Sequence, residues 1–304
     1  MKGTTSAILK AAGAVTFWGA YFTATKIAVS EVSPVTLLWL RFGIGITCLA
    51  LLLSVNNRSF YIKWKDLRDF SILGFIGIFL HNYIQSTGLK TVGAGVSVLI
   101  LASTPIAITI LGRIFLSEKV TLCQLVGIII AVSGVVTVLS GGDIPVLLSI
   151  GTGNPGELLV MGSVFTWAVF SVASKGKLRD HPPDLAMFFA MAAGWLYTSV
   201  PFVISGGFSE ITLISLRGWT SIFFLGVFCS ALGYFFWYDA LSCLPAAKVG
   251  IFMYLSPLVG VAVATILLGE PLTLPVFIGG ILILVGVSLV NLFKGDSDPV
   301  EKNT

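Results

Sequence analysis

Apolar segments of about membrane-spanning length, separated by short polar connections, run along almost the whole chain. A helix that crosses a bilayer needs roughly 20 mostly apolar residues, and connections between neighbouring helices are commonly short. The pattern predicts about ten such helices, at residues 6–26, 34–55, 69–89, 92–116, 121–140, 155–175, 184–205, 218–241, 247–269 and 274–293. The expected fold class is therefore an all-α integral membrane protein.

Landmarks of the first half recur in the second half at a nearly constant offset. Pro105 lies in the middle of one apolar segment, and Pro257 lies at the same place 152 residues later. The same offset relates four further pairs: Gly74 and Gly226, Glu118 and Glu270, Gly127 and Gly279, and Gly134 and Gly286. In the first two helices of each half the offset is 149, which relates Trp18 to Trp167 and Pro34 to Pro183. Chance does not account for so long a run of ordered matches, so an internal repeat is expected.

Each half holds five predicted helices. Because five is an odd number, the second half enters the membrane from the opposite side. The sequence thus predicts two inverted-topology five-helix repeats, at residues 1–143 and 144–304, the second with a short cytosolic tail. Substrate sites of transporters with this design lie near the bilayer midplane between the repeats.

The charge distribution predicts the orientation. Charged residues make up 11% of the chain, against roughly 25% in soluble domains. If the chain starts in the cytosol, 14 of its 18 lysines and arginines fall on the cytosolic side, three fall outside, and Arg41 lies within a span. This positive-inside pattern predicts a multi-pass protein of the cell membrane (the bacterial inner membrane) with both termini cytosolic. The net charge of +4 is then a topology signal, and no nucleic-acid partner is expected.

Polar residues inside the third predicted span are candidates for a substrate site: His81, Asn82, Tyr83 and Gln85. Residues 81 and 85 share a helical face, as do residues 82 and 85. Such side chains are costly in lipid, so they are expected to face the protein interior or a cavity. Hydrogen bonding between helices is the alternative use of these residues.

Aromatic residues supply a second group of cavity candidates. Tyr234, Trp237 and Tyr238 lie in the equivalent span of the second half and would form a flat wall for an amine or aromatic ligand. Trp18 and Phe22 are four residues apart and share one face of the first helix. Plain packing in the helix bundle is the competing interpretation.

Three further residues are candidates for gating. Pro105 and Pro257 each remove a helical hydrogen bond, which predicts a static kink or a bending point. Arg41 lies about two turns into its span and needs a carbonyl group, an acidic partner or an aqueous cavity. It could attract an anion or take part in gating, and the equivalent position of the second half holds Ala190.

The sequence carries no pattern typical of an enzyme or a pump. It lacks His-Glu-x-x-His, Gly-x-Ser-x-Gly and a phosphate-binding Gly-x-x-x-x-Gly-Lys-Ser/Thr loop. Its four cysteines are scattered without metal-ligand spacing. No catalytic residue, cofactor or metal site is therefore expected.

The segment from Trp18 to Lys26, the Ser33-Pro34 start of the second helix with Leu40-Arg41-Phe42, and the Pro105 helix ending in Ser117-Glu118 are each echoed in the second half, apart from Arg41. In order and spacing the chain resembles the EamA-type transporters of the drug/metabolite transporter superfamily, from about Ala11 to Phe293. The resemblance implies ten helices, a central cavity lined by both repeats, and alternating access.

The expected function is secondary active transport in the lipid bilayer. We expect an exporter of small metabolites, namely amino acids, related amphipathic compounds or drugs, coupled to a proton or a counter-substrate. Uptake or exchange of nucleotide-like metabolites is the alternative among transporters. An intramembrane enzyme, a channel and a scaffold are the alternatives outside that class. Both a monomer and a homodimer are compatible with the sequence.

Overall fold

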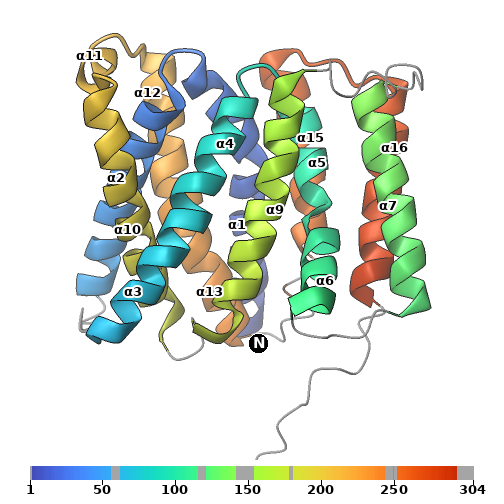
Figure 1. Ribbon diagram of the computed structural model, residues 1–304, viewed down its shortest axis with the longest axis horizontal. Coiled ribbons are helices and arrows are strands. Elements are labelled where there is room, and N and C mark those ends of the chain that lie inside the picture. Colours follow the sequence, from blue (N-terminus) through green and yellow to red (C-terminus); the bar gives the residue numbers. More distant parts are fainter. Residues whose placement is uncertain are drawn as a thin grey trace, which may run out of the picture.

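The computed structural model describes residues 2–55, 62–115, 121–141, 154–177, 181–243, 249 and 252–292. All regular structure in these residues is helical, and the long helices run side by side (Figure 1). In the first half the helices are α1 (Lys2–Val29), α2 (Pro34–Val55), α3 (Trp64–Leu73), η1 (Gly74–Leu80), α4 (His81–Gly88), α5 (Ala94–Ala102), α6 (Thr104–Phe115) and α7 (Leu122–Ser140). In the second half they are α9 (Pro155–Lys177), α10 (Pro183–Ile204), α11 (Gly207–Ile211), α12 (Leu216–Phe223), η2 (Phe224–Leu232), α13 (Gly233–Cys243), η3 (Phe252–Tyr254), α15 (Leu255–Leu268) and α16 (Leu274–Leu292).

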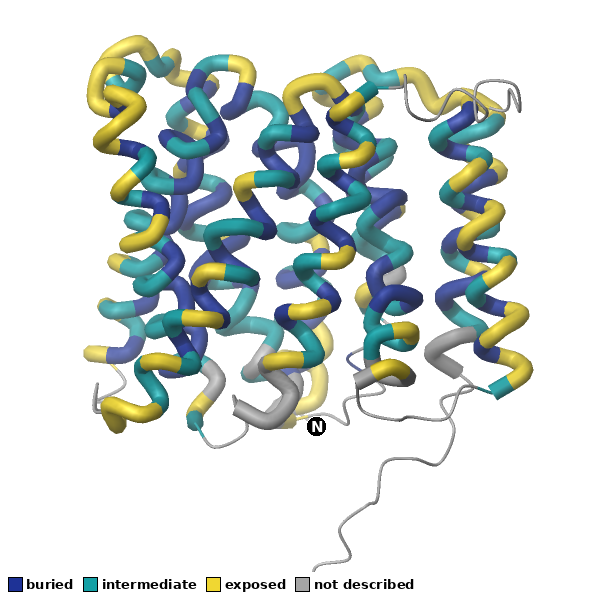
Figure 2. Tube along the Cα trace, in the orientation of Figure 1, coloured by how far each residue is buried: buried dark blue, intermediate teal, exposed yellow. Residues whose placement is uncertain are grey.

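The helices have the length and composition of membrane spans. Six described segments qualify: Pro34–Val55, Ala94–Leu111, Leu122–Ser140, Pro155–Ala173, Asp184–Ile204 and Leu216–Trp237. Leu255–Leu268 and Leu274–Leu289 are shorter apolar helices. Figure 2 shows exposed residues along the outer faces of the bundle, and large apolar side chains such as Leu51, Leu196 and Ile266 are among them. Such a surface suits contact with lipid chains, so the predicted all-α, multi-pass class is confirmed.

Two helices contain π-helical stretches at corresponding positions. The segment η1 joins α3 to α4 without a break, and η2 joins α12 to α13 in the same way. Residues 74–80 of η1 fall on residues 226–232 of η2 at the 152-residue offset. A π-helix leaves backbone groups misaligned with the regular ladder and is frequently found at functional sites. The hydrophobic pattern of the sequence did not predict the π-helices.

Pro105 and Pro257 each lie in the first turn of a helix, but the element that precedes the helix differs between the halves. The break in the first half falls at Ser103, between α5 and α6, so Pro105 lies in the first turn of α6. The Thr104 hydroxyl donates to the Leu101 carbonyl at 2.5 Å, which is the acceptor that a proline at 105 cannot serve. Pro257 lies in the first turn of α15, directly after the short 3-10 turn η3. The predicted boundary between the halves, at Asp143, lies outside the described residues.

Glycines allow α7 and α16 to pack closely along one side of the bundle (Figure 1). A methyl group at Gly134 would lie 2.6 Å from the Gly279 carbonyl oxygen and 2.8 Å from the Ile283 nitrogen. Because both atoms belong to the backbone of α16, they cannot rotate away. Small residues at such contacts are the usual means by which membrane helices approach one another.

We therefore expect Gly134→Ala to destabilise the protein by about 1–3 kcal/mol, the usual cost of overpacking. The matched control is Gly162→Ala, because a methyl group there would meet only Ile84 Cδ1 at 3.7 Å. Thermal unfolding in detergent, followed by size-exclusion chromatography, measures both variants. Equal midpoints for the two would contradict the packing argument.

Candidate functional site

A buried polar network joins α1, α2, α4 and η2 in the interior of the bundle. The Tyr21 hydroxyl donates to Gln85 Oε1 at 2.7 Å and lies 3.3 Å from Asn82 Oδ1. Arg41 Nη1 donates to the same Asn82 oxygen at 3.1 Å, and Arg41 Nε donates to Ser230 Oγ at 2.9 Å. All five residues are less than 9% exposed. The network thus connects residues that lie far apart in the sequence and in both halves of the chain.

The π-helices supply part of this network. Asn82 Nδ2 donates to the carbonyl groups of Gly77 and Ile78 at 3.2 and 2.8 Å, inside η1. Ser230 Oγ donates to the Leu225 carbonyl at 2.9 Å, inside η2. Because a buried carbonyl without a partner is costly, these side chains stabilise the irregular helices. The same side chains present Asn82 Oδ1 and Ser230 Oγ to Arg41.

The guanidinium of Arg41 lies over aromatic rings. Its Cζ is 4.6 Å from the Tyr21 ring centroid and 4.7 Å from that of Phe42. Cation–π contacts of this kind are strongest in desolvated surroundings, and Arg41 is only 6% exposed. The rings therefore hold the guanidinium in position while leaving its edge available for hydrogen bonds.

An aromatic cluster adjoins the network through η2. Trp18 Nε1 donates to the Cys229 carbonyl at 3.1 Å, and Cys229 precedes the Ser230 that binds Arg41. The Trp18 ring lies 5.5 Å from the Tyr234 ring and 5.4 Å from the Trp237 ring, measured between centroids. The structure thus brings together three of the aromatic candidates. The side chain of Tyr238 lies outside the described residues.

The remaining candidates, His81, Tyr83 and Phe22, form no hydrogen bond of the network. His81 Nδ1 lies 3.0 Å from the Ser163 carbonyl oxygen, and its ring is 4.9 Å from the Trp167 ring, so it packs against α9. Asn82 and Gln85 face α1 and α2 instead. Tyr83 stacks on Phe79 at 5.9 Å and is 36% exposed. Phe22, which is buried, contacts Tyr21 edge to face at 5.1 Å.

Four buried polar atoms have no hydrogen-bond partner among the described residues: Thr23 Oγ1, Thr25 Oγ1, Gln85 Nε2 and Ser86 Oγ. They lie on α1 and α4, the two helices that Tyr21 and Gln85 link. Buried polar groups are normally paired, and each exception calls for an explanation such as a ligand or a water molecule. Of the four atoms, Gln85 Nε2 belongs to the network itself, through the residue that accepts the Tyr21 hydrogen bond.

Sequence analysis missed two members of the network, Tyr21 and Ser230. Tyr21 lies three residues after Trp18, so the two share a helical face. Ser230 corresponds to Ile78 at the 152-residue offset. A small polar residue where the other half has an apolar one was the available signal.

Carboxylates cap helix N-termini at the end of the bundle that carries α11, the upper end in Figure 1. Glu270 accepts hydrogen bonds from the backbone N–H groups of Ala94 at 2.7 Å and Gly95 at 2.9 Å, at the start of α5. Glu31 accepts from Ser215 N at 2.8 Å, before α12, and Glu210 from Ser33 N at 2.7 Å, before α2. A negative charge is favourable at these positions because it meets unpaired N–H groups and the positive end of the helix dipole.

Each of these caps joins one half of the chain to the other half. At the same end, Lys26 Nζ donates to the carbonyl groups of Leu89, at 3.3 Å, and Val92, after α4. At the opposite end, Lys10 Nζ pairs with Asp239 Oδ2 at 2.7 Å. The repeat counterpart of Glu270, which is Glu118, lies outside the described residues.

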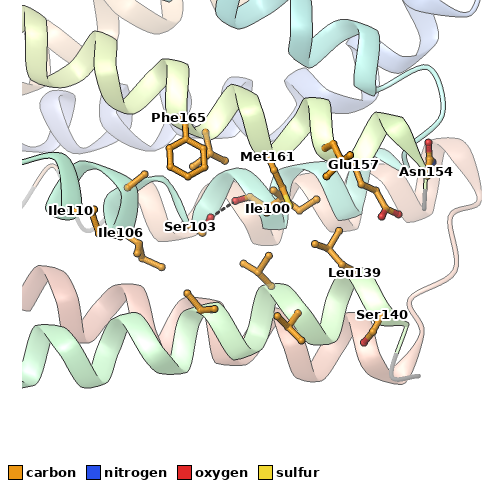
Figure 3. Close-up of a pocket in the computed structure, with 16 residues that line it drawn as sticks. Ile100, Ser103, Ile106, Ile110, Leu139, Ser140, Asn154, Glu157, Met161 and Phe165 are labelled. Carbon is orange, nitrogen blue, oxygen red and sulfur yellow. Dashed lines mark hydrogen bonds between the residues drawn. The ribbon is translucent and has the colours of Figure 1, made fainter. Parts of the chain in front are cut away.

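An apolar groove of about 330 Å³ lies between α5, α6, α7 and α9 (Figure 3). Its polar lining residues are Ser103, Ser140, Asn154 and Glu157, and none of the residues predicted for the site lines it. Several of its apolar side chains, such as Ile110, Leu158 and Phe165, are more than 40% exposed. This groove opens toward the lipid-facing surface and is separate from the polar network.

Comparison with known proteins identifies the family. The family model of the EamA-like transporter family matches residues 5–140 and again residues 154–292. The chain therefore belongs to the EamA-like transporter family. This confirms the predicted EamA-type transporter of the drug/metabolite transporter superfamily, and it confirms that the protein is a transporter and not an enzyme.

Curated relatives match over nearly their full length. An uncharacterized transporter from Archaeoglobus fulgidus is 35% identical over 91% of this chain and 95% of its own. A probable amino-acid metabolite efflux pump from Salmonella typhimurium is 27% identical, with 92% of each chain covered. A probable terminal-alkyne amino-acid exporter from Streptantibioticus cattleyicolor is 26% identical, with 91% of this chain and 90% of its own covered.

One solved crystal structure shares the fold, with a TM-score of 0.65 over 96% of this chain and 99% of the other, at 18% identity.

Glu210 gives a pH-dependent test of the helix caps. Partial burial raises the pKa of Glu210, but hydrogen bonds from Ser33 and Thr36 and the charge of Lys90 outweigh it and hold the pKa below 4.5. Such a carboxylate stabilises the folded state above its ordinary pKa, and this contribution is lost as the pH falls through the lowered value. We expect Glu210→Gln to lose about 0.5–1 kcal/mol of stability at about pH 7, because the cap is partly exposed.

The measurement is the thermal midpoint of the purified wild type and variant between about pH 7 and pH 3.5. Other carboxylates titrate in both proteins, so the informative quantity is the difference between the two midpoints. This difference should shrink at acid pH. A difference that stays constant with pH would show that ionised Glu210 does not stabilise the fold.

Proposed function

We propose that this protein is a secondary active transporter that exports small amphipathic metabolites, amino acids or related compounds, by alternating access. In this proposal ten transmembrane helices form two inverted five-helix repeats, residues 1–143 and 144–304. The substrate binds between the repeats, beside the Arg41 network and the Trp18 cluster. A coupling proton or a counter-substrate supplies the driving force.

Mirrored contacts support the inverted repeat. A methyl group at Gly74 would lie 2.4 Å from the Ala190 carbonyl oxygen, and one at Gly226 would lie 2.9 Å from the Arg41 carbonyl oxygen. The two contacts correspond at the offsets of the repeat, because Gly226 lies 152 residues after Gly74 and Arg41 lies 149 residues before Ala190. Two further pairs of contacts are mirrored at these offsets. Gly194 with Ile78 corresponds to Gly45 with Ser230, and Gly134 with Gly279 corresponds to Gly286 with Gly127. The two separate family matches agree with this division.

The observation that carries the proposal is the position of the π-helices. π-Helical segments are frequent at functional sites, and irregular helices at corresponding positions of two repeats are a feature of transporter binding sites. Here η1 and η2 occupy corresponding positions, and the buried polar network is built on both. The network therefore lies where a substrate would contact both repeats.

The relatives support the direction and the substrate class. Two of them are named as an efflux pump and an exporter of amino-acid compounds. The aromatic rings of Trp18, Tyr234 and Trp237 suit the apolar part of such a substrate. The positive-inside bias of the sequence supports a cell-membrane location with both termini in the cytosol. Uptake or exchange of nucleotide-like metabolites stays the alternative.

The test is untargeted mass spectrometry of medium and cell extract, with and without expression of the protein. We expect at least one metabolite to accumulate outside, and Trp18→Ala and Gln85→Ala to slow its appearance by about 3- to 10-fold, because each removes a contact in or beside the network. Trp64→Ala is the matched control, since Trp64 is 86% exposed at the start of α3. Depletion of a metabolite from the medium would reverse the direction, and no change for any metabolite would contradict the transport proposal.

A further inference from the structure

We propose that Arg41 is the anchor for a carboxylate group of the substrate, so that the protein transports monocarboxylates with an apolar body and rejects the same molecules without the carboxylate. This inference rests on the proposed function, because it assigns the substrate class of the same site. It is carried by two independent features of the buried network: a cation without a counter-charge and a donor without an acceptor.

The first feature is the charge of Arg41. A guanidinium has five N–H donors, and two of them are engaged by described residues, namely Nε by Ser230 and Nη1 by Asn82. Both partners are neutral, and no carboxylate of the described chain forms an ion pair with Arg41. A buried cation in a membrane protein is met by an anion, a carbonyl group or water; here Asn82, Ser230 and the two aromatic rings meet Arg41 without supplying an opposite full charge.

The described acidic residues are engaged elsewhere or lie at helix ends. Glu31, Glu210 and Glu270 cap helices at the end of the bundle that carries α11. Asp239 pairs with Lys10 and Asp66 with His181. Of the others, Asp69 lies 3.9 Å from Arg68 Nε in α3, Glu157 lies in the first turn of α9, and Asp184 lies in the first turn of α10. The missing counter-charge therefore fits a ligand better than a described side chain.

The second feature is the Gln85 amide. Its oxygen accepts the Tyr21 hydrogen bond, while Nε2 is buried and has no partner in the described part of the chain. Gln85 is 1% exposed, so bulk water does not satisfy this donor. An acceptor atom supplied by a ligand would pair with it. Arg41 and Gln85 can therefore both donate hydrogen bonds to an acceptor group of a ligand, although Arg41 is charged and Gln85 is neutral.

The number of charges selects the anion. Arg41 is the one cationic side chain of the network, and its neighbours Tyr21, Asn82, Gln85 and Ser230 are neutral. One positive charge balances a carboxylate, whereas a phosphate monoester would bring nearly two negative charges. A planar carboxylate also matches the geometry of the guanidinium fork. The adjoining Trp18, Tyr234 and Trp237 rings then provide an apolar surface for the rest of the molecule.

The experiment compares wild type with Arg41→Gln and Arg41→Lys in the export assay and classifies every exported compound by whether it has a carboxylate. We expect the exported compounds to be monocarboxylates and their export to fall about 10- to 100-fold in Arg41→Gln, the loss of a charged hydrogen bond. Arg41→Lys keeps the charge and should restore part of the export. The matched control is Arg217→Gln, because Arg217 is exposed in α12, and membrane levels of all variants are measured.

A second variant keeps Arg41 in place in case its loss prevents folding. Gln85→Leu removes the unpartnered donor. Purified wild type and variant are tested with two pairs of competitors of the exported compound, in which the amine is the amino acid without its carboxylate. The pairs are L-leucine with 3-methylbutylamine and L-phenylalanine with 2-phenylethylamine. The inference predicts that the carboxylated member of each pair competes better with the wild type, and that Gln85→Leu reduces this preference. Equal competition by acid and amine, or exported compounds without a carboxylate, would overturn the inference while leaving the transporter intact. If expression moved no metabolite at all, the proposed function itself would fall.

Discussion

The structure depends on the requirement that polar groups inside a bilayer find partners within the protein. Helices meet this requirement largely through their own backbone ladder, and in the π-helical segments η1 and η2 side chains add hydrogen bonds to the backbone carbonyl groups. Side chains complete the hydrogen bonding there: Asn82 serves carbonyls of η1, whereas Ser230 and Trp18 serve carbonyls of η2. The residues that stabilise the irregular backbone are thus the residues that build the polar network. The proposed substrate site therefore coincides with residues that stabilise the fold.

The two halves combine a similar backbone with different chemistry. Glycine contacts mirror each other across the halves, which agrees with the proposed repeat. The side chains at the centre do not: Arg41 corresponds to Ala190, and Asn82 corresponds to Tyr234. The first half therefore supplies the charge, the amide groups and Trp18, and the second half supplies the Tyr234 and Trp237 rings. An amphipathic ligand between them would meet a different surface at each end.

Much of the fold could be predicted from the sequence because apolar length and glycine or proline landmarks survive in both halves. The predicted segment 34–55 coincides with α2, and 121–140 nearly coincides with α7. The candidate site was harder to predict from the sequence. Positions 81 and 85 do lie one turn apart on α4, yet His81 contacts α9 and Gln85 contacts α1. Helical spacing gives a face, but only tertiary packing decides which neighbours that face meets. The π-helices were missed because periodicity assumes a regular helix.

The contacts that join the halves differ in how easily they separate. The caps made by Glu31, Glu210 and Glu270 lie at the partly exposed end of the bundle, where water can replace each hydrogen bond, so each contributes little. The bonds from Arg41 to Ser230 and Asn82 are buried, and breaking them without replacement would leave unpaired polar groups. A motion that parts the halves at the capped end is therefore cheaper than one that separates α2 from η2. A bound anion lowers the second cost, because it keeps the guanidinium paired while its protein partners change.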